Sequence, residues 1–296
     1  MVSARSLFRL NPFGLALAPG IHDIAPDEYH SDPCETPSLS NHVACTLLKQ
    51  SPMHAWMEHP RLNPSRTTEK VKNHYSIGTC AHRMLLEGDD SGVLVVDAKD
   101  WRTKLAQEQR DGAAGRGLVA LLAHEMQEVR DMVRAAHTYL DGTPLRGIFA
   151  KGKPEQTIIW NDAGGVLCRG KLDWLGDDRT LVVDYKTTSV ENPGQFIRTM
   201  TENGYHTQSE LYLRGLAALG HSRARFLFLV QETSAPYLCY LVECGESMRE
   251  LASKQIARAL LLWRDCLAGN RWPGYPGEVY QAEPPMWAFK DEEAAS

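Results

Sequence analysis

The spacing of apolar residues changes character near residue 150 of the chain. Before that point, apolar residues recur at helical spacing, and a serine stands where each of the first two helices would begin. Polar and basic residues at 60–73 predict a loop. Residues 93–96 predict a short strand, and residues 99–115 predict a charged, glycine-containing connection. The predicted helices begin at Ser38 or Ser40 and run through Leu48, begin at Ser51 and run through Trp56, and span 75–87 and 118–140.

After residue 150, β-type runs are separated by clusters of turn residues. The runs 156–160, 166–175 and 180–185 predict an antiparallel meander. Helices are predicted at 193–200, 206–219 and 247–268, and strands at 225–232 and 237–243. The order favours one α/β core with a helical N-terminal addition.

This order sets the expected domain boundaries. We expect an N-terminal arm over 1–36 and a single domain over 37–296. Within that domain, we expect a helical part at 37–145, a catalytic core at 146–270 and a tail at 271–296.

Composition adds two exclusions. Of the 296 residues, 43% are hydrophobic and 23% are charged, which is ordinary for a soluble globular protein and argues against disorder or a coiled coil. The formal net charge of −5 excludes a pervasively basic surface but not a local basic site. Basic loop residues that are candidates for phosphate contacts are Arg61, Arg66, Lys70, Lys72, Lys99, Arg102 and Lys104.

The seven cysteines are an odd number and form no C-x-x-C pair, so we expect reduced thiols in a cytoplasmic protein. The apolar run near the N-terminus is short and interrupted, which argues against a signal peptide. We expect no membrane association, because no stretch approaches the ~18 consecutive apolar residues of a membrane span. A phosphate-binding G-x-x-x-x-G-K-[ST] loop is also absent from the sequence, so no nucleotide-driven motor is expected.

The candidate chemistry lies in two neighbouring predicted strands. Asp184 and Lys186 are two positions apart on one strand, so their side chains leave it on the same face. Asp173, on the preceding strand, is expected beside Asp184 if the two strands pair as a hairpin. Two carboxylates and a lysine suit a hard divalent cation and the hydrolysis of a phosphodiester bond. A lone Asp-x-Lys on a strand is more often a solvated face or an ion pair, but the apolar residues before Asp184 place its carboxylate in a buried strand.

Three further features add weight, although each has an ordinary structural interpretation. His82 lies on an otherwise apolar helix, where it is either a core histidine or a metal ligand. Gln208 and Tyr212 share one helical face because they are four positions apart. Glu155, at the start of the first strand of the meander, either binds metal or caps that strand.

In this order, the motifs resemble the PD-(D/E)xK nuclease superfamily, and specifically its RecB-like and RecE-type phage recombination exonucleases. The resemblance spans roughly residues 28 to 265. It is carried by GTCAHRMLLE around His82, GKLDW around Asp173, VVDYKTT around Asp184, and QSELY from Gln208.

The resemblance implies a fold, a cofactor and a role for each site residue. The fold would be a central mixed sheet flanked by helices. Asp173, Asp184 and His82 would bind Mg²⁺, for which Mn²⁺ would substitute, and Lys186 would be the catalytic lysine. Gln208 and Tyr212 would position the phosphate or the DNA end, and Glu155 matches an acidic position of some members. The spacing of the C-terminal cysteines does not fit an iron–sulfur cluster.

The leading expectation is a Mg²⁺-dependent exonuclease that digests one strand of linear duplex DNA from an end. The single-stranded overhang would serve recombination or repair, with a single-strand annealing protein as a partner and a homo-oligomeric assembly. Two alternatives remain open: a structure-specific or restriction-type endonuclease on the same core, and a catalytically inactive DNA-binding protein.

Overall fold

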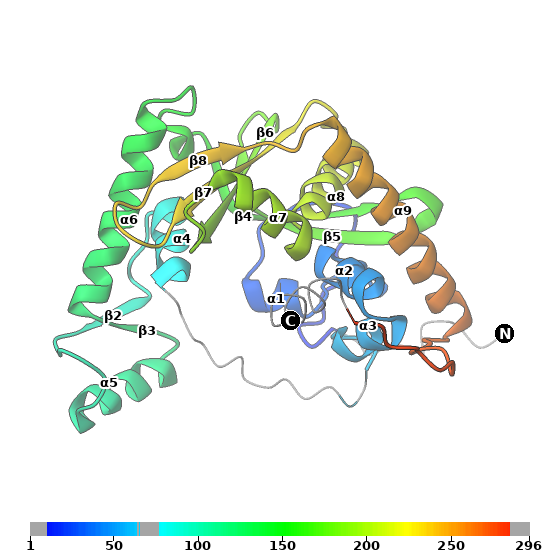
Figure 1. Ribbon diagram of the computed structural model, residues 1–296, viewed down its shortest axis with the longest axis horizontal. Helices are drawn as coiled ribbons and strands as arrows, with labels where there is room; N and C mark the ends of the chain where they lie inside the picture. The colour runs from blue at the N-terminus through cyan, green and yellow to red at the C-terminus, as the bar shows by residue number, and fades with distance from the viewer. Residues whose placement is uncertain (1–10, 64, 66–76, 285–296) are drawn as a thin grey trace, which may run out of the picture.

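A computed structural model describes residues 11–63, 65 and 77–284. Its centre is a mixed sheet of six strands in the order β1-β4-β5-β6-β7-β8 (Figure 1). The β6–β7 pair is parallel and every other neighbouring pair is antiparallel. The strands are β1 (Gly20–His22), β4 (Gly152–Asn161), β5 (Leu167–Gly176), β6 (Leu181–Thr188), β7 (Arg225–Glu232) and β8 (Cys239–Val242).

Helices flank this sheet, so the expected fold class is confirmed. The helices are α1 (Pro26–His30), α2 (Asn41–Lys49), α3 (Pro52–Glu58), α4 (Ile77–Glu87), α5 (Lys104–Gly115), α6 (Ala123–Asp141), α7 (Pro193–Asn203), α8 (Tyr205–Ala218) and α9 (Glu246–Gly269). No helix among the described residues is both long enough and apolar enough to cross a membrane.

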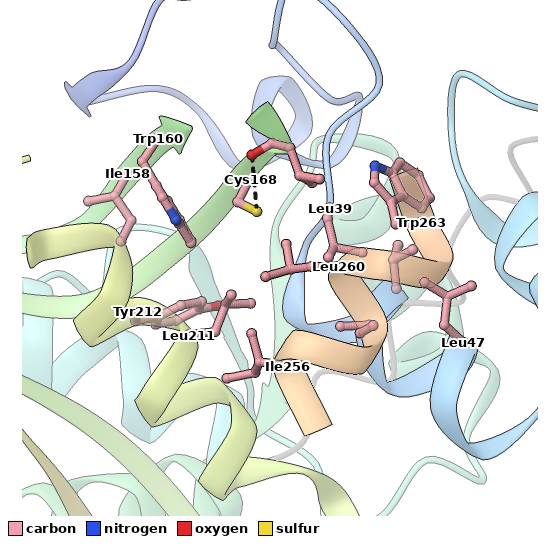
Figure 2. Packing of buried hydrophobic residues seen from close by; sticks show 14 of the residues in the cluster. Leu39, Leu47, Ile158, Trp160, Cys168, Leu211, Tyr212, Ile256, Leu260 and Trp263 are labelled. Carbon is pink, nitrogen blue, oxygen red and sulfur yellow. Dashed lines mark hydrogen bonds between the residues drawn. The ribbon is translucent and has the colours of Figure 1, made fainter. Parts of the chain in front are cut away.

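One face of the sheet packs against α8 and α9, with α2 and α3 beyond them (Figure 2). Trp160 of β4 lies over Gly215 of α8, where an added Cβ would come within 2.7 Å of the indole. A glycine is therefore required for α8 to lie this close to β4. The cluster continues through Leu260 and Trp263 of α9 to Leu47 of α2.

The other face packs against α4 and α6. Trp174, Val183 and Leu229 of the sheet are buried there against apolar residues of both helices. Gly78 of α4 lies so close to β6 that an added Cβ would be 2.6 Å from Thr187 Oγ1. The helix is thus seated directly on the strand that carries Asp184 and Lys186.

A small unit is inserted between α4 and α6. Its two strands, β2 (Val93–Val96) and β3 (Val119–Leu122), pair in parallel, and α5 connects them. The charged connection expected over 99–115 contains helix α5, which Thr103 caps by accepting a hydrogen bond from the Ala106 amide. The helix expected over 118–140 begins only at Ala123, since pairing with β2 draws the preceding apolar residues into a strand.

The serine caps of the first two helices are confirmed. Ser40 accepts a hydrogen bond from the Val43 amide at the start of α2, and Ser51 accepts one from the His54 amide at the start of α3. The segment expected as an arm includes β1, which pairs with β4. In the C-terminal tail, the Pro273 carbonyl accepts a hydrogen bond from the Met53 amide of α3.

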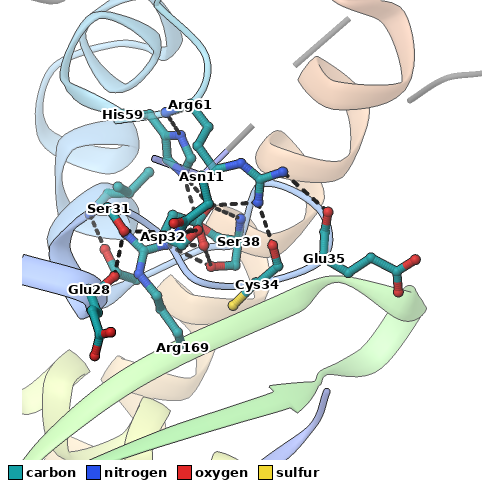
Figure 3. A network of polar contacts seen from close by, with 12 residues as sticks. Asn11, Glu28, Ser31, Asp32, Cys34, Glu35, Ser38, His59, Arg61 and Arg169 are labelled. Carbon is teal, nitrogen blue, oxygen red and sulfur yellow. Dashed lines mark hydrogen bonds and ion pairs between the residues drawn. The ribbon is translucent and has the colours of Figure 1, made fainter. Parts of the chain in front are cut away.

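A buried polar network joins the N-terminal segment to β5 (Figure 3). At its centre is Asp32, which is fully buried and accepts hydrogen bonds from the Ser38 amide and hydroxyl at 3.0 and 2.7 Å. Arg169 of β5 lies 3.2 Å from one Asp32 oxygen, and His59 lies 3.4 Å from the other. Burial raises the pKa of Asp32, but Arg169, His59 and Ser38 together lower it below its usual value. The carboxylate therefore stays charged.

Removing this charge leaves Arg169 buried without its partner. We predict that Asp32→Asn lowers the free energy of unfolding by about 3–5 kcal/mol. Urea denaturation of the variant and the wild type measures the difference. Asp97→Asn, at an exposed aspartate, is the matched control and should change stability by less than about 0.5 kcal/mol. Equal losses in both variants would contradict the role of the network.

His59 makes stability depend on pH in a defined direction. Burial lowers its pKa to about 4, although Asp32 opposes this shift. In the unfolded chain, histidine titrates near 6.5. As the pH falls from 6.5 toward 4, the unfolded chain gains a proton that the folded chain does not, so stability is lost in this window.

We predict that this histidine accounts for about 2 kcal/mol of the stability lost between pH 7 and 5. Urea unfolding of wild type and His59→Gln at both pH values measures it. The variant should lose correspondingly less than the wild type over this interval. Parallel pH dependences would show that His59 is not buried in its neutral form.

Candidate active site on strands β4, β5 and β6

The two central carboxylates are brought together by the β5–β6 hairpin. Trp174 pairs with Val183 in the antiparallel register, so Asp173 and Asp184 lie beside each other on adjacent strands. Val182 and Val183, just before Asp184, are fully buried, and so is Asp184 itself. The hairpin predicted from the sequence therefore places both carboxylates where the motif requires them.

Asp184 is held by two side chains. Its Oδ2 accepts a hydrogen bond of 2.7 Å from Gln208 Nε2 of α8. Its Oδ1 forms an ion pair with Lys186 but has no hydrogen bond of good geometry among the described residues. Burial, with a further contribution from Asp173, raises the pKa of Asp184 to about 7 in spite of Lys186. A cation placed beside this buried carboxyl would favour its charged form.

Lys186 remains charged beside these carboxylates. Burial lowers its pKa, but Asp184 and Asp173 outweigh that effect and raise it above the usual value. The ring of Tyr205, at the start of α8, lies 5.1 Å from the Lys186 ammonium and provides a cation–π contact. The ammonium is thus a positive charge held between Asp184 and the ring of Tyr205.

His82 reaches the site from α4. It is one helical turn beyond Gly78, the position at which α4 touches β6, so it projects over the same part of the sheet. Its Nε2 is 3.0 Å from Asp173 Oδ2, which also accepts a hydrogen bond of 3.0 Å from the Tyr185 amide. The His82 side chain is thus paired with the Asp173 carboxylate and is 26% exposed.

The pKa values of His82 and Asp173 shift in opposite directions. Burial opposes both charged forms. For His82, Asp173 and Glu155 outweigh burial and raise its pKa. For Asp173, Lys186, His82 and the Tyr185 amide outweigh burial and lower its pKa. The two side chains therefore form an ion pair.

Glu155 lies within β4, opposite Asp173 across the β4–β5 pair. Its backbone has a φ of 55°, in the left-handed region that non-glycine residues rarely adopt. One oxygen is 3.9 Å from His82 Nδ1, and the other is 2.7 Å from Lys171 Nζ. Such backbone strain persists only where the surroundings hold it, and it concentrates at functional sites.

The donor atoms fit a divalent cation. His82, Glu155 and Asp173 each offer one ligand atom, and these atoms all lie within 4.8 Å of one another. One imidazole and two carboxylates are suitable ligands for a divalent cation. Asp184, whose Oδ1 pairs with Lys186, lies outside this group of three. The residues present therefore fit a metal centre.

Tyr212 occupies a different position from Gln208. Its side chain is only 6% exposed, and its hydroxyl hydrogen-bonds to Tyr29 and to the main chain of Lys171. Gln208 touches Asp184 directly, whereas Tyr212 lies behind β5. The site residue that sequence reasoning missed is Lys171. It is two positions from Asp173, the same spacing that identified Lys186 beside Asp184.

The expected basic loop residues fall into three groups. The prediction that Arg61 contacts phosphates at the surface is wrong. Its side chain is buried and donates hydrogen bonds to the main-chain carbonyls of Cys34 and Glu35. Arg102 and Lys104 are exposed, but each lies 3.8 Å from an acidic side chain. Lys99 is exposed as well. Arg66, Lys70 and Lys72 lie outside the described residues.

A mixed sheet with two adjacent carboxylates and a lysine at its centre is the arrangement of a PDDEXK-like nuclease fold. A family profile described as "PDDEXK-like domain of unknown function (DUF3799)" matches residues 48–283. The chain belongs to this family, and the expected PD-(D/E)xK membership is confirmed.

Solved structures support the fold. A candidate exonuclease from Eubacterium rectale is 12% identical, with a TM-score of 0.51, over 90% of this chain and 98% of that one. An alkaline exonuclease from Laribacter hongkongensis is 13% identical over 57% of this chain and 84% of its own, with a TM-score of 0.30. A phage-related exonuclease from Haemophilus somnus is 12% identical over 65% and 95%, also at 0.30. No curated protein matches the sequence.

The carboxylates predict stabilisation by divalent cations. We expect Mn²⁺ at 100 times its dissociation constant to stabilise the wild type by about 2.7 kcal/mol, seen as a rise in Tm. Asp173→Asn should lose most of this rise, because it removes a charged ligand. Asp178→Asn, at the exposed tip of the same hairpin, should retain it. Equal responses of Asp173→Asn and the wild type would contradict the site.

Proposed function

We propose that this protein is a Mg²⁺-dependent DNA exonuclease of the RecE type, which hydrolyses one strand of linear duplex DNA from an end. The observation that carries the proposal is the convergence of Asp173, Asp184 and Lys186 on adjacent strands. His82 and Glu155 complete the set from α4 and β4. The family supports a nuclease, and the choice of DNA ends rests on the similarity of the motif order to RecE-type exonucleases.

The proposed chemistry is phosphodiester hydrolysis. His82, Asp173 and Glu155 offer the donor atoms that would hold a metal ion, and Asp184 would join them. When bound, Mg²⁺ would polarise the phosphate and lower the pKa of a coordinated water. The Lys186 ammonium would stabilise negative charge that develops on a phosphoryl oxygen, since its raised pKa keeps it protonated.

Two residues would orient these groups. Gln208 fixes the Asp184 carboxylate through a hydrogen bond to Oδ2. The other oxygen, Oδ1, then faces the Lys186 ammonium. Tyr205 lies against the Lys186 ammonium and limits its movement. Tyr212 would act indirectly on the DNA end, by fixing the main chain of β5 beside Asp173.

Acidic net charge does not oppose binding to DNA. The carboxylates at 155, 173 and 184 contribute to the total of −5, and a bound cation would reverse the local charge that the phosphate meets. Binding would then be confined to the site and depend on metal. The product overhang would pass to a single-strand annealing protein, and a homo-oligomer would keep the enzyme on its DNA end.

Digestion of linear and circular duplexes tests the proposal. With Mg²⁺, the wild type should degrade linear DNA progressively and leave covalently closed circles intact. Without Mg²⁺, it should degrade neither. Cutting of circles would identify an endonuclease instead. DNA binding without any cutting would identify an inactive DNA-binding protein.

The central residues give a sharper prediction. Lys186→Ala and Asp184→Ala should each reduce the rate of digestion by at least ~10²-fold, because they remove the charge that stabilises the phosphoryl group or a metal ligand. Circular dichroism should show that both variants keep their fold. Lys254→Ala, at an exposed lysine of α9, is the control and should digest DNA at the wild-type rate. Near-wild-type digestion by Lys186→Ala would refute the assignment.

A further inference from the structure

Lys171 is a second lysine of the site that the proposed chemistry does not use. It lies on β5 two positions before Asp173, so both side chains leave the strand on the same side. Its Nζ is 2.7 Å from Glu155 Oε2 on the neighbouring strand β4, and its side chain is only 13% exposed. Figure 1 shows the two strands side by side in the sheet. Lys171 therefore contacts an acid of the donor set rather than solvent.

The Glu155 carboxylate needs a positively charged partner to keep its position. Its left-handed backbone is strained within a regular strand, and its carboxylate lies close to Asp173 in a partly buried place. Because the place is partly buried, the two carboxylates repel each other more strongly than they would in water. The positive charge of Lys171 offsets that repulsion and fixes one carboxylate oxygen. The second oxygen is left facing His82 Nδ1 at 3.9 Å.

The base of Lys171 is itself fixed. The preceding residue, Gly170, packs against the ring of Tyr212, where an added Cβ would be 2.5 Å from the nearest ring atom. The Tyr212 hydroxyl also hydrogen-bonds to the Lys171 main chain. The lysine thus extends from an immobilised stretch of β5, which makes it a rigid support for a neighbouring side chain.

We propose that Lys171 is a positioning residue. By holding Oε2 of Glu155, it keeps Oε1 directed at the His82–Asp173 pair and so organises the donor set for a divalent cation. This inference rests on the proposed function, because it assumes that these donors bind a metal.

Two possible roles of Lys171 differ in the sign of their effect. If Lys171 were only a nearby positive charge, removing it would strengthen cation binding by relieving electrostatic repulsion. If it positions Glu155, removing it weakens cation binding, since loss of a group that orients a ligand typically costs about 10- to 100-fold in metal affinity. The direction of the change therefore decides between them.

The experiment is titration of the full chain with Mn²⁺ in the absence of nucleic acid, followed by the EPR signal of free Mn²⁺. We expect Lys171→Met to bind Mn²⁺ about 10-fold more weakly than the wild type. Lys171→Arg, which keeps the charge and can pair with a carboxylate, should restore most of the affinity. Lys153→Met, at an exposed lysine of β4 two positions from Glu155, removes the same charge and should bind no more weakly than the wild type.

A double mutant tests whether Lys171 acts through Glu155. In a Glu155→Ala background, adding Lys171→Met should cause no further loss of Mn²⁺ affinity. If Lys171→Met does not fold, as judged by circular dichroism, Lys171→Gln takes its place with the same expected direction.

The outcomes separate this proposal from the proposed function. Unchanged or tighter Mn²⁺ binding by the folded lysine variant overturns the positioning role, and so does an equal further loss in the Glu155→Ala background. Neither result affects digestion of DNA by the wild type. Conversely, a wild type that binds Mn²⁺ but digests no DNA refutes the nuclease proposal and leaves the Mn²⁺ comparison valid.

Discussion

The burial of one carboxylate beside another is the constraint on which the site depends. Asp184 has no exposed surface, and Asp173 lies next to it on the adjoining strand. Placing two such groups together without water is costly unless positive charge and hydrogen bonds surround them. Lys186 pairs with Asp184, and Gln208 donates a hydrogen bond to it. His82 pairs with Asp173. Helices α4 and α8 each deliver one of these partners, His82 and Gln208.

Strand β5 connects this site with a second buried set of charges. Arg169 pairs with Asp32 in the N-terminal segment, and Lys171 and Asp173 lie two and four positions further along the same strand. The N-terminal segment also touches the strand directly, since Leu39 exchanges main-chain hydrogen bonds with Leu167 and Arg169. The segment from Asp32 to Leu39 is therefore a structural support of the strand that carries Lys171 and Asp173.

Much of the fold and the core of the site could be predicted from the sequence, because they depend on local patterns. Alternating apolar runs identify β4, β5 and β6, and a hairpin necessarily brings Asp173 to Asp184. Other features depend on contacts between distant segments. The residues at 119–122 form a strand only because β2 lies beside them. Neither the unusual backbone of Glu155 nor its pairing with Lys171 leaves a local pattern, since both arise from the register of two strands.

The pairing of Ser38 and Asp32 with Arg169 has a consequence for the synthesis of the protein. Ser38 and Arg169 are separated by 131 positions in the sequence. At translation rates of about 5–20 residues per second, the N-terminal segment waits about 7–26 s for its partner to be made. During that interval, the aspartate and the apolar sides of α2 and α3 have no sheet to pack on. The buried contacts of Asp32 and Ser38 with β5 can therefore form only after the ribosome has made that strand.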